Sequence, residues 1–240
     1  GSGALMETLP DALALAQTMV DIGKLAGKPV VAVITSMAQP LGTHIGNALE
    51  VKDAIDVLAG RTQGDLLEIS LLLGSHMLVL AEKAKTLPEA RAMLENALSS
   101  GAGLRKLAEM IAAQGGDSRV VEDLSLLPQA AVKRVMRAET AGYLSAMDTT
   151  ALGMAAQRMG AGRAKKSDML DYSVGYVLHV RLGDEVTEDT PLATLYARNE
   201  AEAEEAEKAI RKALTIARKK PQAPKLWDAV VTAEGIIYNR

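Results

Sequence analysis

Apolar residues recur every three or four positions between residues 12 and 26, which predicts an amphipathic helix. Thr8 precedes this stretch as a capping residue, Pro10 suits a first helical turn, and Gly27 follows the last apolar position. The next run, Val30–Ile34, is β-branched and has no polar alternation, a pattern typical of a strand covered on both faces. A helix followed by such a strand indicates an α/β sheet.

The polar, glycine-containing segment 35–47 follows this strand and leads into another helical pattern that ends at Leu58 before Gly60. Three more helical patterns, separated by proline and glycine, cover residues 64–85, 88–99 and 103–114. In α/β proteins, ligands usually bind where a loop leaves the carboxyl end of a parallel strand and enters a helix. Segment 35–47 is therefore the main candidate for a functional loop.

The pattern changes near residue 131 to shorter extended pieces. We expect strands and helices, in chain order, at 132–138, 142–146, 149–159, within 172–186, at 190–196 and at 200–219. The strands of 172–186 and 190–196 surround a Gly183-Asp184 turn, and 200–219 is a charged helix with a solvated face. The sequence thus predicts two units, an α/β unit over residues 1–130 and a small α+β module over 131–240.

Composition excludes several classes of protein. The 240 residues are 48% hydrophobic with a net charge of -3, so we expect a globular protein without nucleic-acid or membrane partners. The apolar stretch 66–80 is shorter than the roughly 20 residues that span a bilayer. There is no cysteine, which removes disulfides and thiolate chemistry and is compatible with a reducing, cytoplasmic location. Phe is absent, which argues against aromatic platforms for stacked bases.

The residues that could carry chemistry are few. His44, His76 and His179 have no metal-type partner at i+3 or i+4, so no zinc site is expected. Glu50 and Asp53 lie three residues apart on one face of the helix after segment 35–47. They either complement the helix dipole or, together with carbonyl oxygens of that loop, form a site for a hard cation. No Walker motif, nucleophile elbow or Ser-His-Asp arrangement is present.

Four segments resemble the pyrimidine-nucleoside phosphorylase and thymidine phosphorylase family. They are GSGALM at 1–6, ITSMAQPLGTHIGNALEV at 34–51, SLLPQA at 125–130 and GAGRAKKSDMLDYSVGYVL at 160–178. The resemblance implies part of a phosphorylase α/β domain, with a mixed sheet flanked by helices, and a C-terminal α+β module with a barrel-sandwich-like hairpin. It also implies that a pyrimidine nucleoside and phosphate react to give the free base and ribose or deoxyribose 1-phosphate.

The same resemblance implies three kinds of site residue. Leu5 corresponds to an apolar residue that walls the pyrimidine pocket, with core packing as the alternative. Leu41 and His44 correspond to residues whose main-chain oxygens hold a monovalent cation, potassium, and Asp53 to its acidic ligand. Asp53 replaces the commoner Glu, which shortens the reach of the carboxylate by one methylene.

The GSGALM segment belongs near the middle of a family chain, so we expect that an N-terminal half is missing. That half carries the phosphate-binding Lys-His-Ser-rich loop and the residues that hold the base. We therefore expect no catalytic residue here, no activity from this chain alone, and an incomplete cation site without the other half. Family members form homodimers through the helical domain, and selectivity for thymidine over uridine stays open.

The resemblance also places a basic segment, Arg163, Lys165 and Lys166, in a loop near the inter-domain cleft. This segment is either a latch that helps the two domains close or a solvated basic turn. Three other kinds of protein are alternatives to a phosphorylase. A lipoyl or biotinyl carrier resembles residues 174–196, but Glu200 stands near where its acceptor lysine is needed. An anthranilate phosphoribosyltransferase-like protein would not carry the module from Met147 onward. An excised or engineered scaffold fragment would fold and be catalytically silent.

Overall fold

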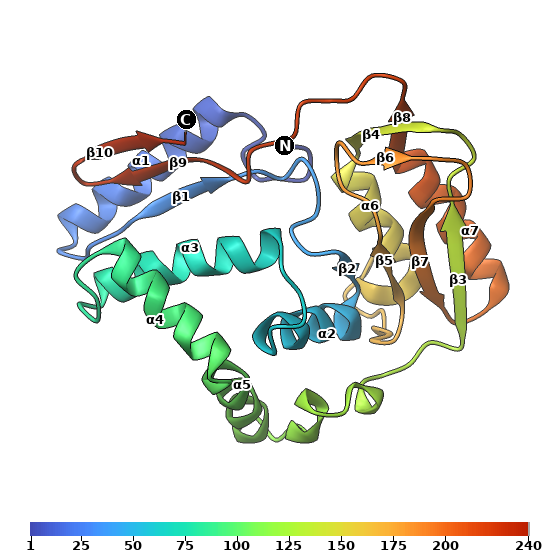
Figure 1. Cartoon of the computed structure of the whole chain (residues 1–240), viewed down its shortest axis with the longest axis horizontal. Helices are drawn as coiled ribbons and strands as arrows, with labels where there is room; N and C mark the ends of the chain where they lie inside the picture. Colours follow the sequence, from blue (N-terminus) through green and yellow to red (C-terminus); the bar gives the residue numbers. More distant parts are fainter. Residues whose placement is uncertain (240) are drawn as a thin grey trace.

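The computed structural model describes residues 1–239, which form two groups of elements (Figure 1). In the first group, α1 (Leu9–Leu25) packs on a three-stranded sheet of order β1-β9-β10. The strands are β1 (Ala32–Thr35), β9 (Trp227–Thr232) and β10 (Gly235–Tyr238). The Thr8 hydroxyl accepts a hydrogen bond from the backbone N–H of Asp11, which confirms the predicted start of the first helix.

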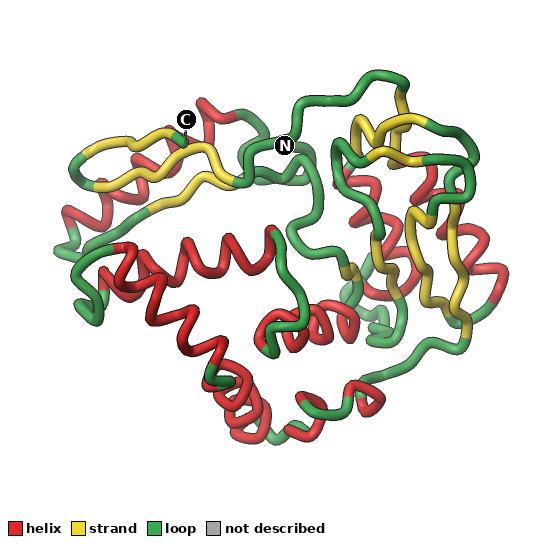
Figure 2. Tube along the Cα trace, viewed as in Figure 1, coloured by secondary structure: helices red, strands yellow, loops and turns green. Residues whose placement is uncertain are grey.

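Four helices follow β1 along the chain: α2 (Asn47–Leu58), α3 (Asp65–Leu80), α4 (Leu87–Ser99) and α5 (Ala102–Ala113). Two 3-10 turns, η1 (Ser118–Val121) and η2 (Leu124–Leu126), connect them to the second group (Figure 2). The third helix is shorter than the predicted 64–85, because the chain leaves helical geometry at Glu82, whose φ is 56°. Within residues 1–239, none of the helices combines the length and apolar character that crossing a bilayer requires.

The second group contains two small antiparallel sheets and two helices. Its elements are β3 (Val132–Arg137), β4 (Gly142–Met147), α6 (Thr149–Ala156), the π-helical turn η3 (Gln157–Ala161), β5 (Gly175–Leu178), β6 (Glu185–Val186), β7 (Pro191–Ala197), α7 (Glu200–Ala213) and β8 (Leu214–Ala217). One sheet has the order β6-β4-β8. The other has the order β2-β5-β7-β3, in which β2 (His44–Ile45) comes from the first half of the chain.

Within the described residues, the buried apolar side chains form three separate clusters. The largest lies inside the second group and includes the fully buried residues Leu144, Tyr176 and Leu195. A second cluster joins α1 to the β1-β9-β10 sheet through Ala16, Val20 and Val231. The third lies between α2 and α3. This arrangement confirms the predicted fold class, an α/β part with a small α+β module.

Three further details differ from the sequence predictions. The charged helix expected over 200–219 ends at Ala213, because Leu214–Ala217 pairs with β4 as a strand. Within the described residues β1 pairs only with β9, and antiparallel, whereas the resemblance implied a mixed sheet. Residues 227–238 belong to the β1 sheet and not to the second group (Figure 1). The proposed boundary at residue 130 stays a prediction.

Candidate functional site

The loop between β1 and α2 (residues 36–46), which we call the β1–α2 loop, is held against the second group of elements. Its short strand β2 pairs with β5, and the Thr43 carbonyl accepts a hydrogen bond from the Leu178 N–H at 2.8 Å. At the end of the loop, Gly46 has a φ of 133° and leads into α2. A Cβ on Gly46 would lie 2.4 Å from the carbonyl oxygen of Val174, so this close approach requires glycine.

Asp53 lies on α2 behind this loop and is 3% exposed. Its Oδ1 is 3.4 Å from Nδ1 of His44. Burial lowers the pKa of His44, and the neighbouring Asp53 opposes this shift only in part, so the imidazole is neutral at pH 7. The nearby cations Lys52 and Arg61 pair with Asp56 instead. The buried carboxylate of Asp53 therefore faces a neutral ring and not a cationic side chain.

Gly42 makes room for this carboxylate. A Cβ at position 42 would lie 2.6 Å from Oδ2 of Asp53, which is shorter than real Cβ contacts. The main chain of the loop at Gly42 therefore passes directly over the carboxylate. Carboxylate and carbonyl oxygens are ligands suited to hard cations. The structure thus brings the predicted residues Leu41, His44 and Asp53 to one corner between the β1–α2 loop and α2.

The other candidate carboxylate, Glu50, does not join this corner. The Oε1 atom of Glu50 accepts a hydrogen bond from the backbone N–H of Gly46 at 3.2 Å, and Glu50 is exposed. Glu50 therefore caps the start of α2, as the helix-dipole interpretation predicts for it. Residues 1–239 contain no group of three His, Asp or Glu side chains arranged to hold a metal ion. Any cation at this corner depends mainly on main-chain oxygens.

Arg181 is a residue of this region that the sequence analysis missed. Its Nη1 donates a hydrogen bond to the Pro40 carbonyl at 2.6 Å, and its Nη2 contacts the Leu41 carbonyl at 3.4 Å. Nη2 also forms an ion pair with Asp65, the first residue of α3. Arg181 is 140 positions from Leu41, and no spacing rule connects residues so far apart.

A cavity of about 360 Å³ lies beside the β1–α2 loop, where the two groups of elements meet. Its lining is mostly apolar and comes from both groups: Thr35, Ser36, Met37, Gln39, Pro40, Leu41, Ile45, Ile69, Thr149, Leu152, Gly153 and Tyr176. The Tyr176 hydroxyl donates a hydrogen bond to the Leu152 carbonyl at 2.8 Å, and burial raises the pKa of this phenol. Tyr176 is therefore a neutral structural residue of the cavity wall. It lies in the DYSVGYVL motif, which was the only sequence signal for it.

Leu5 is 87% exposed, so it is not packed into a core formed by residues 1–239. The segment that carries it rests on the start of α6, where the Thr149 hydroxyl donates a hydrogen bond to the Ser2 carbonyl at 2.6 Å. Thr149 also lines the cavity beside the β1–α2 loop. The structure thus places the Leu5 segment near this cavity.

The remaining candidates lie elsewhere. The Nε2 atom of His179 is 2.7 Å from the Thr194 hydroxyl, which makes it a structural residue of the second group. His76 lies within α3, and the two rings do not join His44 at a common site. Lys165 and its neighbours form an exposed turn whose main chain donates to Asp168 at 2.8 Å. This geometry fits the solvated-turn alternative, and the latch stays a hypothesis.

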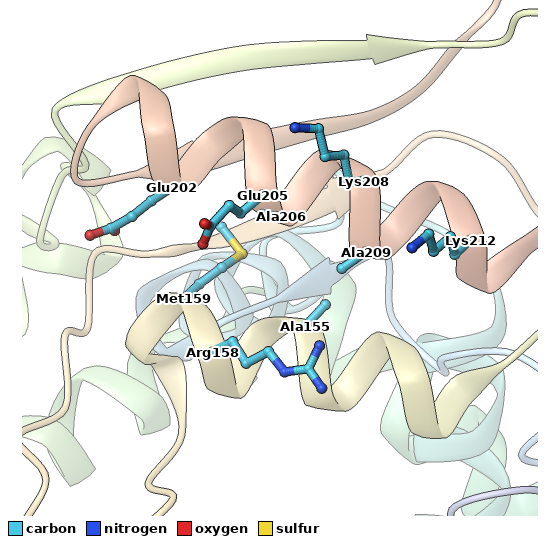
Figure 3. Close-up of a pocket in the computed structure, with 9 residues that line it drawn as sticks. All are labelled: Ala155, Arg158, Met159, Glu202, Glu205, Ala206, Lys208, Ala209 and Lys212. Carbon is cyan, nitrogen blue, oxygen red and sulfur yellow. The ribbon is translucent and has the colours of Figure 1, made fainter.

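A second depression, of about 340 Å³, lies between the helical segment 149–161 and α7 (Figure 3). Arg158 and Lys212 lie on its two sides, and Met159 forms part of its floor. It is lined only by elements of the second group, and no predicted site residue contributes to it. The corner formed by the β1–α2 loop and α2 is therefore the better candidate site.

Comparisons with known proteins give independent evidence on the chain. Residues 1–104 match the family described as "Glycosyl transferase family, a/b domain", and residues 143–217 match the "Pyrimidine nucleoside phosphorylase C-terminal domain". The chain is 50% identical over 200 residues to the pyrimidine-nucleoside phosphorylases of Bacillus subtilis and Geobacillus stearothermophilus, covering 83% of this chain and 46% of each relative. It is 45% identical over 217 residues to that of Staphylococcus aureus, covering 90% and 50%. The chain thus spans about half the length of the curated relatives it matches.

Proposed function

Because the chain belongs to the pyrimidine-nucleoside phosphorylase family, we propose that it takes part in the phosphorolysis of pyrimidine nucleosides. In this reaction a phosphate oxygen bonds to the anomeric carbon while the glycosidic bond breaks. The base leaves with the bonding electron pair and takes up a proton, and the sugar leaves as pentose 1-phosphate. The observation that carries the proposal is 45–50% identity to enzymes of this name along both groups of elements.

We assign the corner between the β1–α2 loop and α2 to a monovalent cation, potassium. The donor types fit this ion, because the buried carboxylate of Asp53 pairs with no Lys or Arg and lies directly under the main chain of the loop at Gly42. Asp53 holds the ion with its side chain, and Leu41 and His44 with their carbonyl oxygens. When bound, the cation supplies the positive charge that balances Asp53.

We assign Leu5 to the wall of the pyrimidine pocket. Its side chain is exposed and apolar, and its segment contacts the start of α6 beside the cavity between the two groups. An apolar wall excludes water, which competes with phosphate for the anomeric carbon. The phosphate and base contacts are proposed to come from a segment equivalent to the half of the relatives that this chain does not span. The homodimer and the cytoplasmic location stay predictions.

The carrier alternative has no support from the local geometry. Asn199, near the expected acceptor position, caps α7 by accepting a hydrogen bond from the Glu202 N–H at 3.0 Å. Residues 143–217 match a phosphorylase C-terminal domain, which a phosphoribosyltransferase-like protein would not be expected to carry.

The test is a phosphate-dependent cleavage assay with uridine and thymidine. It is run on this chain alone and after adding a separately expressed N-terminal half of a close relative, each with potassium chloride or sodium chloride. We expect activity only in the mixture, higher with potassium, and reduced by Asp53→Ala. Activity from the chain alone would contradict the proposed division of the site. No activity in any mixture whose partners associate would support the alternative of a silent scaffold fragment.

A further inference from the structure

Arg181 connects the hairpin of the second group to the β1–α2 loop and to α3. We propose that Arg181, together with Asp65, is a positioning residue that fixes the direction of the Leu41 carbonyl for the cation. This inference rests on the cation site proposed above. In addition to the proposed ligands, Arg181 would set the geometry of the site without itself touching the cation.

The contacts of Arg181 require a guanidinium group. Its Nη1 bonds the Pro40 carbonyl at 2.6 Å, and its Nη2 reaches both the Leu41 carbonyl and the carboxylate of Asp65. A planar fork of N–H groups can serve acceptors in these separate directions, whereas the ammonium of lysine is a single point. Two successive peptide planes of the loop are thus held by one side chain, which determines where the Leu41 oxygen points.

The Leu41 carbonyl can accept from Arg181 and bind a cation at the same time. A carbonyl oxygen has two lone pairs, so a contact from Nη2 leaves a second one available for a cation. A bare guanidinium next to a cation site would repel the ion, but Asp65 pairs with Arg181 and cancels its charge. The pair therefore orients the carbonyl without adding net charge to the corner.

Gln39 reinforces the same connection. Its Nε2 donates to Asp65 at 3.3 Å, and its Oε1 accepts from the Leu182 N–H at 2.9 Å. The side chains of Gln39, Asp65 and Arg181 thus tie the start of α3 and the β1–α2 loop to the hairpin of the second group. The consequence is that cation binding and the attachment of the second group stabilise each other.

The test measures the melting temperature of this chain, alone and mixed with the separately expressed N-terminal half of a close relative, against potassium chloride, at constant ionic strength adjusted with choline chloride. Asp53→Ala tests the cation site itself. Arg181→Lys keeps the positive charge and removes the planar guanidinium. R181Q/D65N removes the contacts of the guanidinium with the loop and with residue 65, and leaves these two positions with no net charge, as in the unmodified chain. Arg91→Lys is the control, because the guanidinium of Arg91 also pairs with a carboxylate in the first turn of α3, Glu68, but its other partner is Glu95 of α4 and not the β1–α2 loop. Hydrogen exchange of residues 37–46 is measured on each variant.

We expect potassium to raise the melting temperature of the unmodified chain and of Arg91→Lys, and not that of Asp53→Ala. Arg181→Lys and R181Q/D65N are expected to need about 10-fold more potassium for half the effect, the usual cost of losing a residue that orients a metal ligand. Both should also exchange faster over residues 37–46.

Two results overturn the inference and can be told apart. If potassium has no specific effect on the unmodified chain, either alone or mixed with the N-terminal half, or if its effect survives Asp53→Ala, the proposed cation site fails and the inference fails with it. If the effect depends on Asp53 but Arg181→Lys shows an unchanged potassium requirement or unchanged exchange over 37–46, only the positioning role fails.

Discussion

At the scale of single residues, the candidate site depends on a glycine as much as on its carboxylate. Replacing Gly42 with alanine would place a Cβ 2.6 Å from Oδ2 of Asp53 and force one of them to move. We expect Gly42→Ala to remove most of the potassium-dependent rise in melting temperature. Gly153→Ala is the control, since a Cβ there meets no atom within 4 Å. An unchanged potassium response in Gly42→Ala would show that the carboxylate is not held under the loop.

The pH dependence of stability also belongs to single residues. Burial lowers the pKa of His76, and its Nε2 atom is buried without a hydrogen-bond partner within residues 1–239. As pH falls below the ordinary histidine value, the unfolded chain takes up a proton that the folded chain refuses, so acid destabilises the fold. We expect His76→Leu to lose less stability than the unmodified chain between about pH 7.5 and about pH 5.5, values that span the histidine titration. Urea unfolding at both pH values measures this, and equal losses would exclude His76 as a source of acid sensitivity.

At the scale of elements, helix starts were predictable and strand partners were not. The Thr8 and Pro10 signals mark the first helix correctly because a cap is a local hydrogen bond between neighbouring residues. Leu214–Ala217 follows a charged helical pattern without a break, and only its pairing with β4, about 70 residues earlier, makes it a strand. The same holds for β9, whose partner β1 lies at the other end of the chain.

The cap of α7 gives a prediction at this scale. The Asn199 side chain accepts a hydrogen bond from the Glu202 N–H at 3.0 Å and satisfies a free donor of the first turn. Asn199→Ala should lower the free energy of unfolding by about 1 kcal/mol, the usual cost of losing such a cap. Asn96→Ala, an exposed position within α4, is the control and should be neutral or slightly stabilising because alanine favours helix. Urea unfolding followed by circular dichroism compares the two, and equal effects would argue against capping by Asn199.

At the scale of the whole molecule, the site lies where distant parts of the chain meet. The residues Leu41, His44 and Asp53 lie close together in sequence, and a family resemblance was enough to indicate them. Arg181 and Tyr176 come from the second group and reach the same region where β2 pairs with β5, so no spacing along the chain could place them beside Leu41. The loop that carries Leu41 and His44 is therefore also one of the attachments between the two groups of elements.

This attachment leads to a prediction about unfolding. The cluster containing Leu195 lies within the second group, and the cluster containing Val231 joins α1 to the β1 sheet, with no shared buried residue. We expect two unfolding steps, because separate cores connected by a polar loop need not melt together. Leu195→Ala should destabilise the second group by about 2–5 kcal/mol, and Val231→Ala the β1 sheet by about 1.5–3 kcal/mol.

Hydrogen exchange in increasing urea distinguishes the steps, because it follows each strand separately. Leu195→Ala should lower the urea midpoint of β5 and β7 and leave β1 and β9 nearly unchanged, and Val231→Ala should do the reverse. Potassium should bring the urea midpoints of the two groups closer together. A cation held by the β1–α2 loop stabilises this loop, which contacts both groups. If either variant shifts all four strands equally without potassium, the chain is one cooperative unit, and the loop cannot act as a connection that a cation strengthens.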